Sequence, residues 1–153
     1  MDPARLLGTW DFRREVHDRL TGTDYAATGE ATFTAEGAGR VRWAENGTLR
    51  WADRSTPVTR TLFLTPRRPG AAPPGSATAA PGWWVTFEDG RDFHPWTARP
   101  VEHVCGRDLY RGSVEPASPT GAPHAWTVRW HVTGPAKDYT MVSRYSAHDL
   151  TAP

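Results

Sequence analysis

The sequence predicts an all-β protein built as one antiparallel up-and-down β-barrel of about ten strands, with a β-sandwich as the second choice. Three observations favour this fold. Short segments that alternate apolar and polar residues recur throughout the 153 residues, and turn-forming Gly, Asn and Asp residues separate them. Eight tryptophans, five phenylalanines and four tyrosines favour strands. An antiparallel sheet leaves two exposed edges unless it closes, which favours the barrel.

Composition limits the class of protein and its partners. The length predicts a single domain over residues 1–153, and the net charge of +1 gives no basic surface for nucleic acid. No apolar run approaches the roughly 20 residues that span a membrane, and the N-terminus lacks a signal-peptide core. The single cysteine, Cys105, excludes an internal disulfide and fits a reducing compartment. We therefore expect a cytoplasmic protein without nucleic-acid or membrane partners; its oligomeric state stays open.

The first half of the chain predicts a short helical turn followed by five strands. Asp2-Pro3 fits the N-cap and first position of a turn that ends by Leu7. Asn46-Gly47 predicts a two-residue hairpin turn, because both residues tolerate positive φ. On this basis we expect strands at 8–19, 27–34, 41–45, 48–52 and 58–65.

The second half continues the same pattern after a loop. Residues 66–82 are rich in Pro, Gly and Ala, which predicts a surface loop within the single domain, because strand alternation resumes at Trp83. Two hairpins follow, with turns at Asp89-Gly90 and Gly106-Arg107. A second loop is expected at 115–123. The last two strands are expected at 125–133 and 138–146, joined by a turn at Gly134-Pro135.

The first of these hairpins carries an aromatic face with a histidine. A turn at Asp89-Gly90 places Val85 opposite His94, Thr86 opposite Phe93 and Glu88 opposite Arg91. The face with His94 then also holds four further side chains, Trp83, Phe87, Asp92 and Trp96. In a closed barrel this face lines an aromatic cavity.

The second hairpin gathers groups that can exchange protons. A turn at Gly106-Arg107 places His103 opposite Tyr110 and Cys105 opposite Asp108. A histidine titrates near neutral pH, and a neighbouring carboxylate or phenol can hold its tautomer. The opposite face carries the apolar pair Val104 and Leu109, so the sequence leaves open which face points inward.

Further candidates are single residues. Arg14 shares the face of Trp10 and Phe12, where it either binds an anionic head group or pairs with an inner carboxylate such as Glu45. Trp130 lies on the apolar face of its strand, and Lys137 is expected in an ion pair at a barrel mouth. Four histidines are expected outside the barrel without a role: His17, His124, His131 and His148. No His-x-His or Glu-x-x-His spacing supports a metal site at His94 and His103, so none is predicted.

The sequence resembles two groups of known barrel proteins. Gly8-Thr9-Trp10 resembles the Gly-x-Trp opening of lipocalin-like (calycin) barrels, and Arg144 stands where that superfamily has an arginine packed across this tryptophan. Segments 8–10, 88–94, 103–105 and 134–139 resemble an uncharacterised family of lipocalin-like actinobacterial proteins. The resemblance implies a barrel, with structural roles for Gly8, Trp10 and Arg144, and no established activity. Lacking a disulfide, the chain is most similar to the intracellular branches, such as fatty-acid-binding and nitrobindin-like barrels.

Three functional hypotheses follow. The first is a small-molecule-binding barrel, without a cofactor, for a hydrophobic or aromatic ligand that can carry an anionic group; the expected lining residues are Arg14, Trp83, Phe87, His94, Trp96, Cys105 and Trp130. The second is a cofactor-independent acid–base enzyme of the isomerase, cyclase or hydratase type, with candidate catalytic residues His103, His94, Tyr110 and Asp108. The third is nitrobindin-like haem binding through His94. The sequence has no nucleotide-binding Gly-rich loop, nucleophile elbow or zinc motif.

Overall fold

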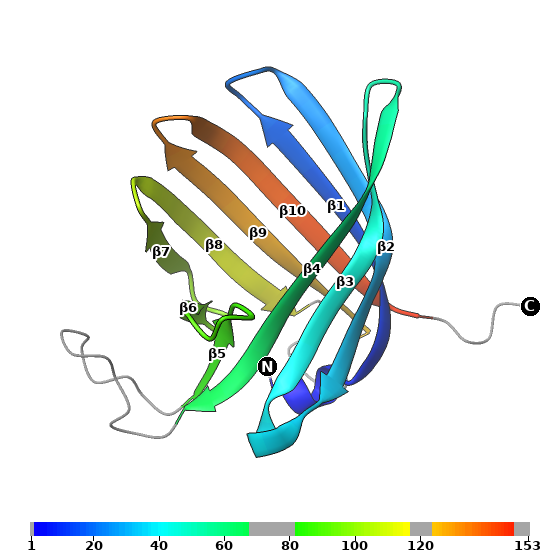
Figure 1. Ribbon diagram of the computed structural model, residues 1–153, viewed down its shortest axis with the longest axis vertical. Helices are drawn as coiled ribbons and strands as arrows, with labels where there is room; N and C mark the ends of the chain where they lie inside the picture. Colours follow the sequence, from blue (N-terminus) through cyan, green and yellow to red (C-terminus); the bar gives the residue numbers. More distant parts are fainter. Residues whose placement is uncertain (1, 68–81, 117–123, 149–153) are drawn as a thin grey trace, which may run out of the picture.

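The computed structural model describes residues 2–67, 82–116 and 124–148, and these form a single antiparallel sheet of ten strands (Figure 1). The sheet order is β6-β5-β4-β3-β2-β1-β10-β9-β8-β7, so the first and last strands pair and the sheet curls into an up-and-down barrel. This confirms the predicted fold class. The strands are β1 Gly8–Asp18, β2 Thr23–Ala35, β3 Val41–Trp51, β4 Arg54–Arg67, β5 Gly82–Thr86, β6 Asp92–Pro95, β7 Val101–Cys105, β8 Asp108–Pro116, β9 Ala125–Gly134 and β10 Lys137–Ala147.

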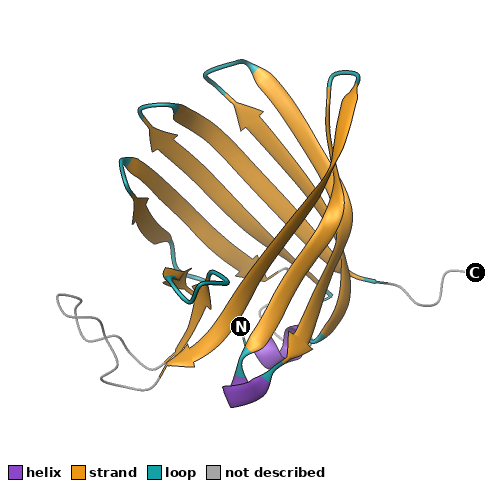
Figure 2. Ribbon diagram, viewed as in Figure 1, coloured by secondary structure: helices purple, strands orange, loops and turns teal. Residues whose placement is uncertain are grey.

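The predicted N-terminal turn is present and closes one end of the barrel. It is the 3-10 helix η1, Pro3–Leu6, and the Asp2 side chain accepts a hydrogen bond from the Ala4 amide at 3.0 Å. A second 3-10 helix, η2, Gly37–Gly39, connects β2 to β3 at the same end (Figure 2). Leu6 is fully buried, so η1 acts as a plug for this end of the barrel.

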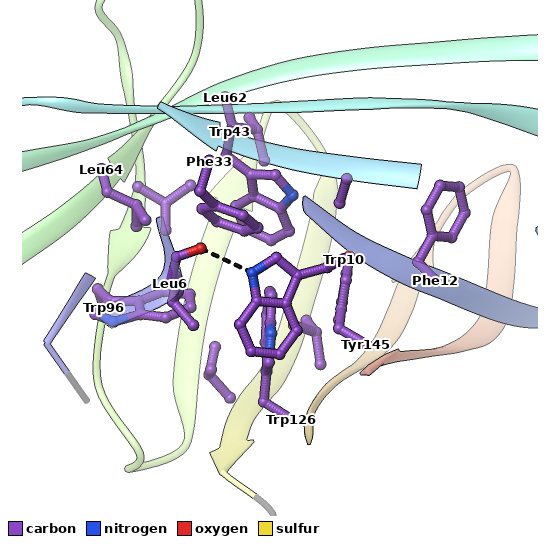
Figure 3. Close-up of a cluster of buried hydrophobic side chains, with 14 of the residues drawn as sticks. Leu6, Trp10, Phe12, Phe33, Trp43, Leu62, Leu64, Trp96, Trp126 and Tyr145 are labelled. Atoms are coloured by element: carbon purple, nitrogen blue, oxygen red, sulfur yellow. Dashed lines mark hydrogen bonds between the residues drawn. The ribbon is translucent and has the colours of Figure 1, made fainter. Parts of the chain in front are cut away.

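A cluster of aromatic side chains fills the closed end (Figure 3). Trp10 Nε1 donates to the Leu6 carbonyl at 2.7 Å, which ties the first strand to the plug. Trp126 stacks on Tyr145 with 3.8 Å between ring centroids and packs edge-on against Trp43 at 5.4 Å. Because these rings interlock at nearly perpendicular or parallel angles, they form a dense core.

The predicted turn at Asn46-Gly47 is wrong, because β3 continues through both residues to Trp51. The chain reverses instead at residues 52–53, where Ala52 adopts φ 47°. Gly47 lies opposite Gly29 of β2, and a Cβ at Gly47 would meet the Phe12 ring at 2.9 Å. This glycine therefore allows close approach inside the sheet, which local turn chemistry alone does not distinguish from a hairpin.

The β5–β6 hairpin differs in part from the prediction. Val85 pairs with His94 as expected, but a bulge follows, and Thr86 pairs with Asp92 in place of Phe93. The Phe87 amide donates to the Arg91 carbonyl at 2.9 Å, so the loop holds three residues and ends on Gly90 at φ 82°. The predicted Glu88–Arg91 pair is therefore wrong.

The loop geometry explains this difference, because three-residue hairpin loops place a left-handed residue last and shift the register by one. Arg91 Nε instead bonds Asp89 Oδ2 at 2.7 Å, within the loop. The shift also has a consequence for the interior. Phe93 and His94 both contact Trp130, with ring centroids 5.1 Å and 5.0 Å away, although they are adjacent in sequence.

The β7–β8 hairpin has the predicted register, with His103 opposite Tyr110 and Cys105 opposite Asp108. Val104 is 69% exposed, which places its face outside. His103 and Tyr110 therefore point toward the interior, while Cys105, near the turn, is exposed. This answers the question of orientation that the sequence left open.

Arg144 does not pack across Trp10, contrary to the expectation from the calycin resemblance. It pairs with Arg13 across the β1–β10 ladder, and its Nη1 bonds Glu15 Oε2 at 2.9 Å on the outer face. Trp10 points inward and meets Trp126 edge-on at 6.3 Å. Strand alternation separates the two side chains, because Trp10 and Arg144 lie on opposite faces of the sheet.

Side chains bridge the β6–β7 seam of the barrel, where backbone pairing ends. The sheet order leaves β6 and β7 as its two edges. The rings of Phe93 and His103 meet edge to face, with 5.1 Å between their centroids. The wall formed by β5 and β6 is also much shorter than the β3–β4 wall beside it (Figure 1).

The two predicted loops fall mostly outside the described residues. Of residues 66–82, Pro66 and Arg67 belong to β4 and Gly82 to β5, whereas 68–81 are not described. Of residues 115–123, the first two belong to β8 and 117–123 are not described. Among the described residues, no helix has the length and hydrophobicity that crossing a membrane requires.

Candidate functional site

A cavity of about 190 Å³ lies inside the barrel, away from the aromatic core of the closed end. Strands β4, β8, β9 and β10 and the β5–β6 hairpin supply its walls. Arg60 is the one charged residue among those that line it, and two tyrosines add hydroxyl groups. The complete lining is Arg60, Leu62, Phe87, Phe93, Tyr110, Trp130, Val132, Tyr139 and Met141.

The apolar wall of this cavity is largely aromatic. Phe93 stacks on Trp130 with centroids 5.1 Å apart and an interplanar angle of 19°. Phe87 packs against Phe93 at 5.0 Å, and Tyr110 meets Phe93 edge-on at 6.1 Å. Such rings present both faces and edges to a guest, so the wall suits a flat apolar molecule.

A buried ionic network lies next to the cavity. Glu45, 4% exposed, accepts from Arg14 Nη2 at 2.7 Å through one oxygen and from Arg60 Nη2 at 2.7 Å through the other. The Tyr145 hydroxyl also donates to Glu45 at 2.6 Å. Burial alone would raise the pKa of Glu45, but Arg60 and Arg14 outweigh it and hold the pKa below its ordinary value. Glu45 is therefore ionised at neutral pH.

Arg14 was predicted either to bind an anionic head group or to pair with an inner carboxylate, and it pairs with Glu45. Its Nε donates to Ser143 Oγ at 2.7 Å, and its Nη2 also reaches the Tyr145 hydroxyl at 3.2 Å. Arg14 thus holds the network together and does not line the cavity.

Arg60 is the functional candidate that the sequence analysis missed. Its guanidinium lies over the Trp43 ring, 5.0 Å from the centroid, and its Nε is buried without a hydrogen-bond partner among the described residues. A signal was available in the sequence. In the expected strand 58–65, Arg60 alternates with Leu62 and Leu64, which are both buried, so the same period that places them in the core points Arg60 inward.

His94 is buried beside the network and is neutral. Its Nδ1 lies 2.9 Å from the Pro95 carbonyl, so Nδ1 carries the proton and Nε2 remains an acceptor. Burial lowers the pKa of His94 to about 4, against the opposing effect of the bond to Pro95. With Trp96, it lines a separate inner void of about 10 Å³, next to the larger cavity.

A polar cluster lies at the end of the cavity near the β9–β10 turn. Lys137 Nζ is 2.6 Å from Asp108 Oδ2 and donates to the Tyr110 hydroxyl at 3.1 Å. Burial raises the pKa of Tyr139, which also lines the cavity, to about 12, which keeps that phenol protonated. The predicted ion pair of Lys137 is present, and its partner is Asp108.

The remaining predicted residues divide into three groups. Phe87, Tyr110 and Trp130 line the cavity. His103 is half-buried against the lining residues Phe93 and Tyr110, and burial lowers its pKa, whereas Trp83 is half-buried against the hydrophobic core. Cys105 is exposed, and Asp108 is held by Lys137. The lining residues missed by sequence reasoning are Arg60, Leu62, Phe93, Val132, Tyr139 and Met141.

The expected outer histidines lie where the sequence places them. His17 pairs with Asp24, and His131 and His148 bond acidic residues on the outer face. Within the described part of the chain, ligand atoms converge for a metal ion at one group, Asp11, Glu30 and His148, and not at His94 and His103.

Comparison with known proteins supplies a family and no activity. The chain matches no curated protein. Residues 6–147 match a family of unknown function, DUF6314, and this match covers the whole barrel from the end of η1 to the end of β10. The chain is therefore a member of the family of unknown function DUF6314.

Proposed function

We propose that this protein binds a small hydrophobic or aromatic molecule inside the barrel. The observation that carries the proposal is the cavity of about 190 Å³, walled by Phe93, Trp130 and Phe87, in a barrel whose opposite end is densely packed. Pockets for drug-sized ligands span roughly 300–1,000 Å³. The smaller volume here suits a ligand of one or two rings.

The polar groups around the cavity support an oriented binding mode. Tyr110 and Tyr139 place hydroxyl groups at one end, and Arg60 places a cation in the wall. A few polar groups in a mostly apolar pocket fix the orientation of a ligand, while the apolar walls supply most of the affinity. We propose that the protein acts inside the cell. We also propose that it is related to the lipocalin-like barrels. The buried Trp10 at the head of β1 supports this relation, and the outward Arg144 does not.

Isothermal titration calorimetry with indole, 2-naphthol and 2-naphthoate tests the binding function. We expect saturable binding of at least one of these probes. Met141→Trp fills the cavity and should abolish that binding, whereas Thr140→Trp, the next residue along β10 and outside the lining, should leave it unchanged. Absence of binding by all three probes, or equal binding by both variants, contradicts the proposal.

A second candidate function is a cofactor-independent acid–base enzyme on the same cavity. The observation that favours it is the Tyr110 hydroxyl in the cavity wall, which accepts a bond from Lys137 at 3.1 Å. A nearby cation stabilises negative charge on a phenol oxygen, and His103 lies next to Tyr110 with 6.0 Å between centroids. Deuterium exchange into a bound carbon acid, lost in Tyr110→Phe, would separate catalysis from binding alone.

Haem binding through His94 has less support. The space beside His94 is the inner void of about 10 Å³, which is close to the volume that one water molecule occupies. A macrocycle requires a much larger opening at the histidine. The cavity favours the smaller ligand.

A further inference from the structure

We propose that Arg60 binds an anionic group of the ligand, so that the natural ligands are small aromatic acids. This inference rests on the proposed binding function and narrows its ligand class. It depends on three features of the interior: the charge balance of the buried network, the unpartnered donors beside it, and the position of Arg60 between the two internal spaces.

The buried network carries one positive charge in excess. It contains two guanidinium groups, those of Arg14 and Arg60, and the single carboxylate of Glu45, which contacts both at 2.7 Å. Tyr145, the hydroxyl partner in the network, is fully buried, and this burial raises its pKa, so it stays uncharged. His94 is also neutral. The Arg60 side chain is 30% exposed, against 12% for Arg14, so an anionic ligand that reaches Arg60 balances the excess charge.

Three buried donors have no partner among the described residues. Two of them, Arg60 Nε and Trp43 Nε1, belong to residues that line the inner void, and the third is Trp126 Nε1. Arg60 uses Nη2 for Glu45 and for Tyr145 at 3.4 Å, which leaves Nε available. A buried donor without an acceptor costs free energy, and a ligand oxygen would remove that cost. The guanidinium edge is also the geometry that carboxylates bind through paired hydrogen bonds.

Arg60 lies where it can bind the anionic group of a ligand whose ring occupies the cavity. Arg60 lines both the cavity of about 190 Å³ and the inner void of about 10 Å³, and Trp43 lines the inner void. Since that void is about one water molecule in size, it accommodates a single oxygen atom. A carboxylate at Arg60 then leaves the attached ring in the larger cavity, against Phe93 and Trp130. A free inorganic anion has no ring that could contact this aromatic wall.

A matched pair of ligands tests the inference. Calorimetry at neutral pH compares 2-naphthoate with 2-naphthamide, which has the same rings and no charge. We expect the acid to bind at least roughly tenfold more tightly, the range expected for a charged hydrogen bond. Arg60→Met should remove this preference, and Arg60→Lys should retain part of it. Arg50→Met is the control, because Arg50 is an exposed arginine on the outer face of β3. 2-Naphthalenesulfonate shows whether the preference extends beyond carboxylates.

The outcomes separate the inference from the function beneath it. Equal binding of the acid and the amide by the wild-type protein, or an acid preference that survives in Arg60→Met, overturns the role of Arg60 while ligand binding stands. Failure of both naphthalene ligands and of the neutral probes to bind overturns the binding function itself. If Arg60→Met shows no cooperative melting transition, the test is made with Arg60→Lys. A preference of Arg60→Lys for the acid over the amide that equals the preference of the wild-type protein counts against the inference.

Discussion

The two ends of this barrel contain similar aromatic residues and yet differ in packing. At the closed end, η1 inserts Leu6, and Trp10, Trp43 and Trp126 interlock into a core (Figure 3). Toward the other end, Phe93 and Trp130 also stack, with centroids 5.1 Å apart, and still border a cavity of about 190 Å³. Aromatic content therefore does not determine whether the interior is filled.

The difference lies in the walls and in the plug. The N-terminal helix covers the closed end. The β5–β6 hairpin pairs with β4 only along Phe63–Arg67, a bulge interrupts its own ladder, and Phe87, in the loop of this hairpin, lines the cavity. Because the cavity has no equivalent of Leu6 among the described residues, its aromatic side chains line a space and do not fill it.

The largest expected effect comes from opening the closed end. Trp126→Ala removes a ring that is 1% exposed and stacked on Tyr145, so the free energy of unfolding should fall by about 3–5 kcal/mol. Trp51→Ala is the matched control, because Trp51 is half-buried where β3 reaches the β3–β4 turn. Its cost should be about 1 kcal/mol. Urea unfolding measures both, and similar losses would show that the two ends do not differ in packing.

The next effect depends on pH and on His94. Burial lowers the pKa of folded His94 to about 4, from the ordinary 6.5, so the unfolded chain binds the proton first as the pH falls. The stability linked to His94 is then complete above pH 6.5 and lost between pH 6.5 and pH 4. Its size is about 3 kcal/mol.

Urea unfolding of wild-type and His94→Phe proteins between pH 7.5 and pH 4 isolates this contribution. The wild-type protein should lose more stability than the variant over this range. Since the carboxylates titrate in both proteins, the difference between the two curves reports His94. Parallel curves would mean that the folded protein accommodates a charged imidazole at this position.

The smallest expected effect compares two tyrosine hydroxyls. Tyr139→Phe removes a half-buried hydroxyl group from the cavity lining, and the unfolding free energy should fall by about 1 kcal/mol or less. Tyr145→Phe removes a fully buried bond to the Glu45 carboxylate, 2.6 Å long, and should cost about 1.5–3 kcal/mol. Thermal melts of the two variants give the comparison. Equal shifts would contradict the view that the cavity side is the more tolerant of change.

Local pattern predicts most of the fold and less of the site. Alternation places Trp10, Phe12 and Trp130 inside, and the turn at Gly106-Arg107 gives the register of β7 and β8. These features depend on residues that are close in sequence. The same reasoning offers Glu45 as a partner for Arg14, because both lie on inward faces.

The errors arise where a distant contact decides the outcome. Gly47 is glycine because Phe12 and β2 approach it, and a short sequence window does not contain those neighbours. The bulge after Val85 turns Phe93 inward, which strict alternation does not predict. Whether Arg14 or Arg60 remains available to a ligand depends on how Glu45, Ser143 and Tyr145 divide their hydrogen bonds, and this is a property of the assembled barrel.

The seam between β6 and β7 has a consequence for how fast a guest enters and leaves. Anywhere else around the wall, separating two neighbours would break a row of backbone bonds, an event comparable to local unfolding. At the seam, the contacts include those of the His103 ring with the rings of Phe93 and Phe87. Ring rotation and loop displacement occur within nanoseconds to microseconds. Opening the wall at the seam therefore requires side-chain and loop motion, while the ladders of the barrel stay intact.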